Sequence, residues 1–353
     1  MGKKYSQSAF TSLVVLNFVV GFSWIAYHNY QPRLLEEFKL NSISEFLFYA
    51  QWMILFAVPG LAGKLSDNML RSKNKYLIVY ITGITVAAMT FMSVALGVGI
   101  INLLSLRPLV PFLVIIWLIS MNMFVAPANA LLKNIGEQDR LPKLMAILII
   151  GIEGVYALEP VIIPLIEGMG AVFTFISGGL LVTFAGVWFQ RQLRKNPEIM
   201  TIDYEEKPDH NPFVFIATSI AFGSIFAFII AMLPSQIEVN SSLDGNTSVA
   251  VLLGFSTLIA WPVSQLSNRF SLQLLSLVGW VMGSISIFLL FTISNEIFFY
   301  ASLIILGLSC SLLSVTTFPL ALKNIPARNL ALGTGIFLGI AEGFEGFYQW
   351  LLR

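Results

Sequence analysis

Four glutamates stand inside long apolar segments of the sequence, where carboxylates are rare. They are Glu153 and Glu159 in residues 144–166, and Glu342 and Glu345 in residues 330–352. A carboxylate in an apolar medium costs several kcal/mol of solvation free energy, so it normally faces a cavity or is protonated. Because no Lys or Arg lies near the middle of either segment, burial favours the neutral form of these acids. Such groups can carry protons, or bind a cation or a cationic substrate.

Two of these acids also have a simpler interpretation. Glu159 precedes Pro160 and Glu345 lies within about three helical turns of the end of its segment, so both are also suited to a wet position at the membrane rim. Tyr156 follows Glu153 by three residues, which places it on the same helix face, in position to hydrogen-bond a ligand.

The composition indicates which kind of element must hold these acids. Of the 353 residues, 57% are hydrophobic and 11% are charged, whereas soluble domains carry about 25% charged residues. The apolar residues form runs of about 20, the length of helix that crosses the roughly 30 Å hydrocarbon layer. The chain is therefore expected to be an integral membrane protein with the lipid bilayer around it.

The same composition excludes several other classes of protein. The single Cys310 allows no intrachain disulfide and no cysteine-built metal site, and two histidines make a histidine-built metal centre improbable. A net charge of +1 without a basic cluster argues against nucleic-acid binding. The sequence contains no phosphate-binding loop, and His28 and His210 are poorly placed for a hydrolytic triad. We therefore expect no bound cofactor and no enzyme activity.

Hydropathy predicts an all-α fold with eleven transmembrane spans. The apolar runs are too long for the strands of a membrane β-barrel, and they lack the alternation of apolar and polar residues that such strands show. The spans are expected at residues 8–30, 43–62, 76–103, 109–132, 144–166, 171–189, 212–233, 247–263, 272–293, 297–322 and 330–352.

The positions of the cations predict the orientation. With the N-terminus inside, sixteen of the 20 Lys and Arg residues fall on the inner side, and Arg33, Lys39, Arg107 and Arg353 fall outside. Positive residues are enriched on the cytoplasmic side of membrane proteins. The N-terminus is therefore expected in the cytoplasm, with the protein in the plasma (inner) membrane.

An internal repeat predicts two bundles of helices. The sequence Ala-Leu-Leu-Lys-Asn-Ile at 130–135 precedes the fifth span, and Ala-Leu-Lys-Asn-Ile at 321–325 precedes the eleventh; Glu153 and Glu342 then occupy related positions. The polar stretch 191–211 follows the sixth span, either as a linker between bundles or as a plain solvated loop. The expected units are 1–190, with six helices, the linker 191–211, and 212–353, with five helices. Duplicated halves are typical of secondary transporters.

The segment between the second and third spans carries a family resemblance. It reads Gly-Lys-Leu-Ser-Asp-Asn-Met-Leu-Arg at 63–71 and resembles the cytoplasmic signature Gly-x-Leu-x-Asp-x-x-Gly-Arg of the major facilitator superfamily. Leu70 replaces the second glycine of that signature. The resemblance implies that Gly63, Asp67 and Arg71 form a conformational latch, with the carboxylate favoured by a helix dipole and by Arg71; the alternative is an ordinary capped turn.

The resemblance also implies a cavity between the bundles. In this family the first and fourth helices often line it, which makes Trp24, His28 and Asn122 candidate substrate contacts together with Tyr156. For His28 the alternative is a side chain at the membrane interface. The fourth span has no arginine and the fifth lacks the Gly-Pro signature of drug–proton antiporters, so drug export by antiport is disfavoured.

Two functions remain open at this point. The first is a secondary active transporter that moves a small polar solute by alternating access, coupled to a proton or cation through Glu153, Glu342, Glu159 and Glu345. The second is a transporter-like receptor or structural subunit with partners in a membrane complex. The second is favoured by the absence of a twelfth span before Arg353, where a two-times-six architecture is expected to continue.

Overall fold

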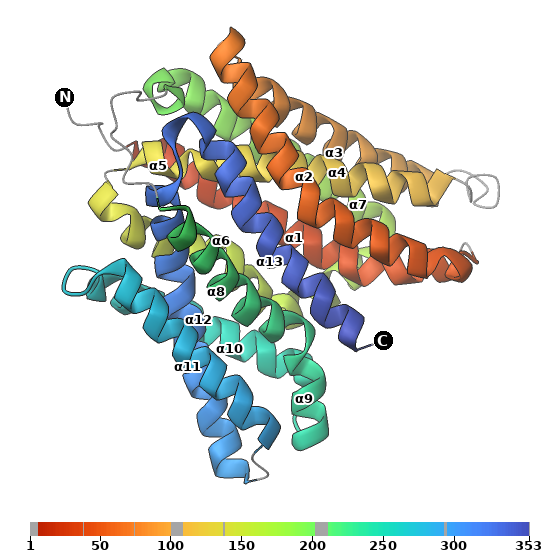
Figure 1. Ribbon diagram of the computed structural model, residues 1–353. Coiled ribbons are helices and arrows are strands. Elements are labelled where there is room, and N and C mark those ends of the chain that lie inside the picture. The colour runs from red at the N-terminus through yellow and green to blue at the C-terminus, as the bar shows by residue number, and fades with distance from the viewer. Residues whose placement is uncertain are drawn as a thin grey trace.

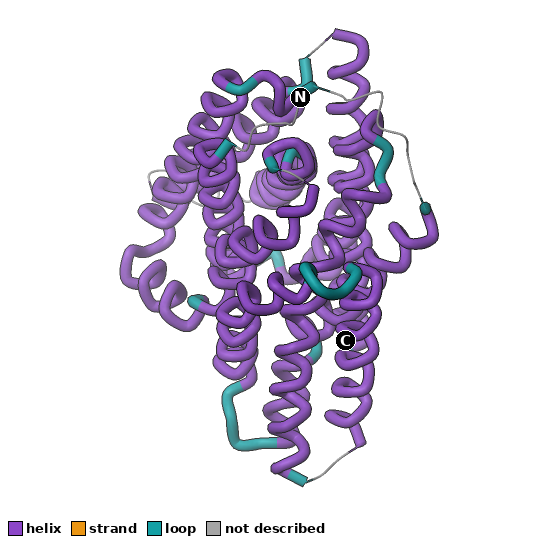
Figure 2. The backbone as a smooth tube through the Cα atoms, turned by 90° about the vertical axis from the view of Figure 1, so that its left-hand side faces the viewer, coloured by secondary structure: helices purple, strands orange, loops and turns teal. Residues whose placement is uncertain are grey.

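The computed structural model describes residues 6–37, 39–73, 75–99, 109–136, 138–201, 211–292 and 295–352. Every regular element among these residues is a helix (Figure 2). Several residues used above lie outside the described part of the chain. They are Lys3, Lys4, Arg107, Arg353 and residues 202–210 of the linker, which include Lys207 and His210.

The described residues of the first half of the chain form seven α-helices. They are α1 (Gln7–Glu37), α2 (Ser44–Lys73), α3 (Leu77–Gly99), α4 (Val110–Ala130), α5 (Leu132–Ile135), α6 (Leu141–Ala157) and α7 (Glu159–Lys195). Short 3-10 turns at Asn41–Ile43, Gln138–Arg140 and Pro197–Met200 lie between or after them.

In the second half, the part of the chain that the structure describes forms six α-helices. They are α8 (Pro212–Ala231), α9 (Leu233–Asn240), α10 (Gly245–Leu266), α11 (Leu272–Thr292), α12 (Glu296–Asn324) and α13 (Leu330–Leu351), with a 3-10 turn at Ala327–Asn329. Side-chain caps mark three of the starts: Asn211 begins α8, Asp244 begins α10 and Asn295 begins α12 by accepting backbone N–H groups of the first turn.

Ten helical stretches among the described residues are long and apolar enough to cross a membrane. The count differs from the eleven expected because the fifth span is divided between two helices. It begins in α6, which has 17 residues, and continues after Leu158 into α7. Gly170 then takes a left-handed conformation, with φ of 74°, that separates residues 159–169 from 171–195. The sixth span starts after this glycine.

The outer surface of the helices is apolar, as a lipid environment requires. Phe213 and Leu258 are each 79% exposed, and Ile297 is 78% exposed. A soluble protein rarely leaves side chains of this size uncovered at this density. The positions therefore agree with contact between these helices and lipid.

The two halves of the chain meet along two related helix pairs. α2 packs along α13, and α6 packs along α10 and α12. Figure 1 shows α13, in blue, lying beside α2, in orange, across the middle of the molecule. Since α2 and α10 are related by the repeat, as are α6 and α13, the two interfaces follow its two-fold pattern.

Glycines bring α2 and α13 into close contact. A β-carbon on Gly335 would clash with the carbonyl oxygen of Pro59, and one on Gly339 with that of Phe56. Small residues let the backbones of membrane helices approach in this way. Trp52 reinforces the pair, since its indole Nε1 donates to the carbonyl of Gly343 at 3.1 Å.

Candidate functional site

Asp67 joins α2 to the first turn of α13. Its two carboxylate oxygens accept the backbone N–H groups of Ala331 at 3.2 Å and Leu332 at 2.9 Å, and the residue is 3% exposed. The first N–H groups of a helix have no partner within the helix and carry its positive dipole end. A carboxylate from the other half of the chain satisfies both, so this contact holds the two halves together.

Gly63 and Arg71 have different places in this contact. A β-carbon on Gly63 would clash with the backbone of Ala331, so glycine is needed for α13 to approach. Arg71 donates to Asn68 and, at 3.3 Å, to the backbone carbonyl of Asp67, both on its own helix. It supplies a nearby positive charge to the carboxylate, whose hydrogen bonds come from α13.

A second contact closes the same end of the molecule. Lys133 in α5 is 6% exposed, and its Nζ donates to the carbonyl of Ile325, at the end of α12, at 3.4 Å. We call this end, which also carries Asp67, Arg140 and Arg328, the basic end. It is closed by contacts between the two halves of the chain.

The repeated asparagines Asn134 and Asn324 have a role that sequence reasoning missed. Asn134 donates to the carbonyl of Ile199 at 2.9 Å, and Asn324 accepts from the backbone N–H of Asn211 at 3.1 Å. Each asparagine anchors one flank of the linker to its own half of the chain. The signal was the repeated Lys-Asn-Ile itself, which we used only to detect the duplication.

The opposite end of the molecule is hollow. A cavity of about 390 Å³ lies between the end of α1, the start of α2 and the end of α13. Its lining is mostly polar and consists of His28, Gln31, Pro32, Leu35, Ser44, Phe48, Gln51 and Gln349. We call this the polar cavity. It lies at the start of α2 and the end of α13, whereas Asp67 and Ala331 lie at the opposite ends of these two helices.

Glu342 and Glu345 lie beside the polar cavity. They line a small hollow that shares Phe48, Gln51 and Gln349 with it. Gln349 donates to Glu345 Oε1 at 3.0 Å. These two acids and Glu159 also act electrostatically on the Tyr156 hydroxyl, so carboxylates of α7 and α13 lie on the same side of the molecule as this tyrosine of α6.

Glu153 occupies a separate, buried site. It is 2% exposed, and its Oε2 accepts from the Ser256 hydroxyl of α10 at 2.8 Å. The Cys310 thiol of α12 lies 3.9 Å from the same oxygen. Ser314, one turn further along α12, is 1% exposed, and its hydroxyl also interacts with the Glu153 carboxylate. Glu153 thus faces hydroxyl and thiol groups from the other half of the chain.

None of the four glutamates forms an ion pair with a described residue. An ion pair does join Arg33 to Glu167. Glu153 and Glu342 occupy repeat-related positions but do not share a site. Glu153 lies in the α6 interface with α10 and α12, and Glu342 lies in the α13 interface with α2.

The candidate substrate contacts are spread over several environments. His28 lines the polar cavity directly. Trp24 is half-buried and packs edge-to-face on Tyr27 and Trp117, at centroid distances of 5.6 and 5.0 Å. Asn122 is buried, its amide donates to the carbonyl of Leu118 on its own helix, and it is not among the residues that line the polar cavity.

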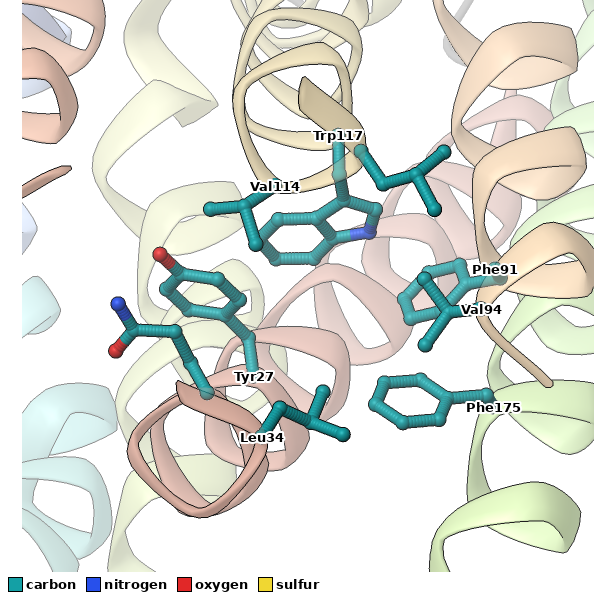
Figure 3. A pocket seen from close by; sticks show the side chains of 9 residues that line it. Tyr27, Leu34, Phe91, Val94, Val114, Trp117 and Phe175 are labelled. Atoms are coloured by element: carbon teal, nitrogen blue, oxygen red, sulfur yellow. The ribbon is translucent and has the colours of Figure 1, made fainter. Parts of the chain in front are cut away.

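An aromatic hollow adjoins the polar cavity. It has a volume of about 40 Å³, and its largest side chains are Tyr27, Phe91, Trp117 and Phe175 (Figure 3). Tyr27 stacks on Trp117 at 4.6 Å and donates from its hydroxyl to Gln51 at 2.9 Å. Sequence reasoning missed Tyr27 and Gln31, because polar and aromatic residues near span ends are ordinarily interface anchors. It also missed Gln51, a single amide inside the second span.

No group of three or more His, Cys, Asp or Glu residues is placed to hold a metal ion within the described ranges. The fold and the site together define a polytopic helical membrane protein with a cavity between two bundles. Residues 90–344 match the family model of the Major Facilitator Superfamily. The chain belongs to this superfamily.

Solved structures agree with this family. A bacterial homologue of the iron transporter ferroportin, in an outward-facing state, superposes with a TM-score of 0.67 at 14% identity, covering 98% of this chain and 90% of that one. The human organic anion transporter MFSD10 (TETRAN) gives a TM-score of 0.62 at 12% identity, covering 97% and 92%. No curated protein sequence matches. The family and these neighbours support a membrane transporter.

Proposed function

We propose that this protein is a secondary active transporter that moves a small polar solute by alternating access, driven by a proton or cation gradient. The observation that supports this most strongly is that the α2–α13 pair is closed at one end and open to a cavity at the other. Asp67 ties the helices together at the basic end, and the polar cavity lies between them at the other. A solute could enter that cavity and not pass beyond it.

The basic end faces the cytoplasm in this proposal. Its excess of Lys and Arg follows the positive-inside pattern, which supports an N-terminus inside and a polar cavity toward the outer face of the plasma membrane. Units 1–190 and 212–353, joined by the linker 191–211, would then rock about the solute. Release inside requires Asp67 to leave α13 and Lys133 to leave Ile325.

Glu153 is the preferred coupling residue. In its neutral form it is readily buried between α6, α10 and α12, where Ser256 donates to it. In its ionised form the same burial is costly, so loss of the proton favours separation of these helices and entry of water. Protonation is thereby linked to which end is open. Glu342, Glu345 and Glu159 are placed to respond at the second interface.

The cargo of the solved neighbours is not transferred to this chain. One neighbour is described as an organic anion transporter and the other as a homologue of an iron transporter, so one fold serves chemically different solutes. The amide and imidazole groups of Gln31, Gln51, Gln349 and His28 support a solute with hydrogen-bonding groups.

Uptake by purified protein in liposomes tests this proposal. A panel of small cations, sugars, amino acids and organic anions would be offered with and without an imposed pH gradient. We expect gradient-driven uptake of at least one class of solute. Glu153→Gln, which mimics the neutral acid, should abolish the response to the gradient, whereas Glu238→Gln at an exposed position should not.

Two results would contradict this proposal. Uptake by Glu153→Gln that still follows the pH gradient would remove Glu153 from the coupling mechanism. Stable co-purification with membrane partners, and no uptake over the whole panel, would instead favour the receptor or structural-subunit function.

A further inference from the structure

We propose that the transported solute is a small, uncharged, polyhydroxylated molecule with the size and chemistry of a hexose. This inference rests on the proposed transport function and specifies its substrate class. Three properties of the polar cavity carry it: the volume, the chemistry of the described lining, and two glutamine side chains whose orientation the protein fixes.

The polar cavity has room for a small solute. Its volume of about 390 Å³ equals that of about thirteen water molecules at about 30 Å³ each. A hexose, with about a dozen atoms heavier than hydrogen, occupies a similar volume. The two neighbouring hollows, of about 40 and 10 Å³, are too small for a ring. The solute is therefore confined to the polar cavity.

The described lining of the cavity carries no formal charge of the Lys, Arg, Asp or Glu type. An ammonium or carboxylate group that entered would lose hydration without gaining an opposite charge, which is strongly unfavourable. Glu342 and Glu345 line the smaller hollow beyond Gln51 and Gln349, which has space for about one water molecule. A solute in the polar cavity thus meets the amides rather than the acids.

Gln51 presents hydrogen-bond donors to the cavity. Its side-chain oxygen Oε1 accepts the Tyr27 hydroxyl at 2.9 Å. Figure 3 shows this hydroxyl on the side of Tyr27 that points away from Phe91 and Phe175. Since the oxygen is engaged within the protein, the amide nitrogen Nε2 supplies the N–H groups that remain for a solute.

Gln349 presents the complementary group. Its amide nitrogen Nε2 donates to Glu345 Oε1 at 3.0 Å, which leaves its side-chain oxygen as an acceptor for a solute. Gln51 and Gln349 line the same two hollows, so a donor and an acceptor lie near each other on the cavity wall.

This pair of groups matches neighbouring hydroxyls. A hydroxyl both donates and accepts, so a diol can accept from the Gln51 N–H and donate to the Gln349 oxygen. An ammonium group has only donors and an ionised carboxylate has only acceptors. Either would leave one of the two glutamines without a partner, and an unpaired polar group is costly.

The remaining lining suits the rest of such a molecule. The imidazole of His28 and the amide of Gln31 provide further hydrogen-bonding groups. Pro32, Leu35 and Phe48 add a smaller apolar surface, which fits the C–H groups of a sugar ring. A polyhydroxylated solute therefore finds partners for both its hydroxyl and its C–H groups.

Binding to the purified full-length protein in lipid nanodiscs tests the assignment. The neutral probes are glucose, galactose and mannose. The matched probes are their 2-amino derivatives, which carry an ammonium group, and their uronates, which carry a carboxylate. Uracil is a neutral, planar probe without hydroxyls. We expect at least one neutral sugar to bind at least about tenfold more tightly than its two charged derivatives and than uracil.

Three results would overturn the proposal. They are tightest binding of a charged derivative or of uracil, equal binding of all probes, and no binding of any neutral sugar.

Two variants locate the site. Gln31→Glu adds a carboxylate at almost unchanged size and should shift the preference toward the 2-amino sugar by at least about tenfold. Gln349→Leu removes the acceptor and should weaken binding of the neutral sugar about three- to tenfold. The matched controls are Gln273→Glu and Gln273→Leu, at an exposed position on α11, which should change neither. If Gln349→Leu fails to fold, Gln31→Glu alone decides. Unchanged preferences in folded variants would contradict the site.

The result is distinct from the test of transport. Binding of a neutral sugar with no uptake of any solute would refute the transport function and keep the binding site. Uptake of another solute class, with no binding of a neutral sugar, would refute the substrate class and keep the transport function.

Discussion

Replacing Asp67 by asparagine should open the basic end of the molecule. The carboxylate accepts two backbone N–H groups of α13, at 3.2 and 2.9 Å, while 3% exposed. Asparagine keeps one oxygen but loses the charge and one hydrogen bond. A hydrogen bond to a charged group contributes about 1.5–3 kcal/mol, and the charge–dipole interaction at a partly buried helix start contributes up to about 2 kcal/mol. A loss of about 2 kcal/mol shifts the equilibrium toward the opened state by roughly thirtyfold.

Thiol accessibility measures this shift. Cys310 is the single cysteine of the chain and is buried, so Cys310→Ser gives a clean background. Ser66 is 0% exposed and precedes Asp67 on α2, and Ser66→Cys reports opening of the interface through its rate of labelling by a polar maleimide. We expect Asp67→Asn to raise that rate by roughly thirtyfold, following the population of the open state.

The control makes the same substitution at a carboxylate that caps a different helix. Asp244→Asn alters another carboxylate that caps a helix start, at the exposed beginning of α10, and should leave the labelling rate of Ser66→Cys unchanged. An unchanged rate in Asp67→Asn as well would refute the reasoning that this carboxylate holds the basic end closed.

Three further predictions concern stability. Gly335→Val should lower the melting temperature of the protein in detergent, because the new side chain meets the Pro59 carbonyl and overpacking costs about 1–3 kcal/mol. Ala301→Val, at an exposed, lipid-facing position, should leave the melting temperature unchanged. Equal melting temperatures of the two variants would contradict the close approach of α2 and α13. Asn17 and Asn129 exchange side-chain hydrogen bonds at 2.9 and 3.1 Å in the core. Asn129→Leu should destabilise by about 1–3 kcal/mol, because the buried Asn17 Oδ1 loses its donor while Asn17 Nδ2 keeps its bond to the Leu13 carbonyl. Asn17→Leu with Asn129→Leu should recover part of this, and additive losses in the double-mutant cycle would count against the pair. The Thr247 hydroxyl and backbone N–H hold the pKa of Asp244 below its ordinary value, so its contribution to stability is present above the unfolded-state pKa and is lost as the pH falls through the folded-state pKa; Asp244→Ala should remove that component of the acid unfolding curve, and identical curves would show that the cap contributes nothing.

The helices were predictable because membrane spans follow from local hydropathy alone. The apolar runs and the positions of Pro and polar residues placed most helix ends, since each run must satisfy its own backbone hydrogen bonds in lipid. The division of the fifth span was not predictable in this way. It depends on the backbone conformation of Leu158, between α6 and α7, which does not change the hydropathy of the segment.

For each site, the sequence predicted one residue of the contact but not its partners in the other half of the chain. Asp67 and Gly63 were recognised from a motif of nine residues, but their partners Ala331 and Leu332 lie more than 260 residues away in the chain. Glu153 stood out as an acid in an apolar run, whereas Ser256 and Cys310, which face it, look like ordinary small residues of apolar helices. Such pairings arise from packing between the two halves of the chain, which no local pattern encodes.

The central claim, that the two ends of the α2–α13 pair open in turn, is tested most directly by distance measurements between spin labels. One pair, at the exposed positions 68 and 328, reports the basic end, and a second pair, at the exposed positions 36 and 351, reports the end with the polar cavity. Comparison of Asp67→Asn with the unmodified protein should show the first distance lengthening and the second shortening. Two distances that stay fixed, or that lengthen together, would contradict alternating access.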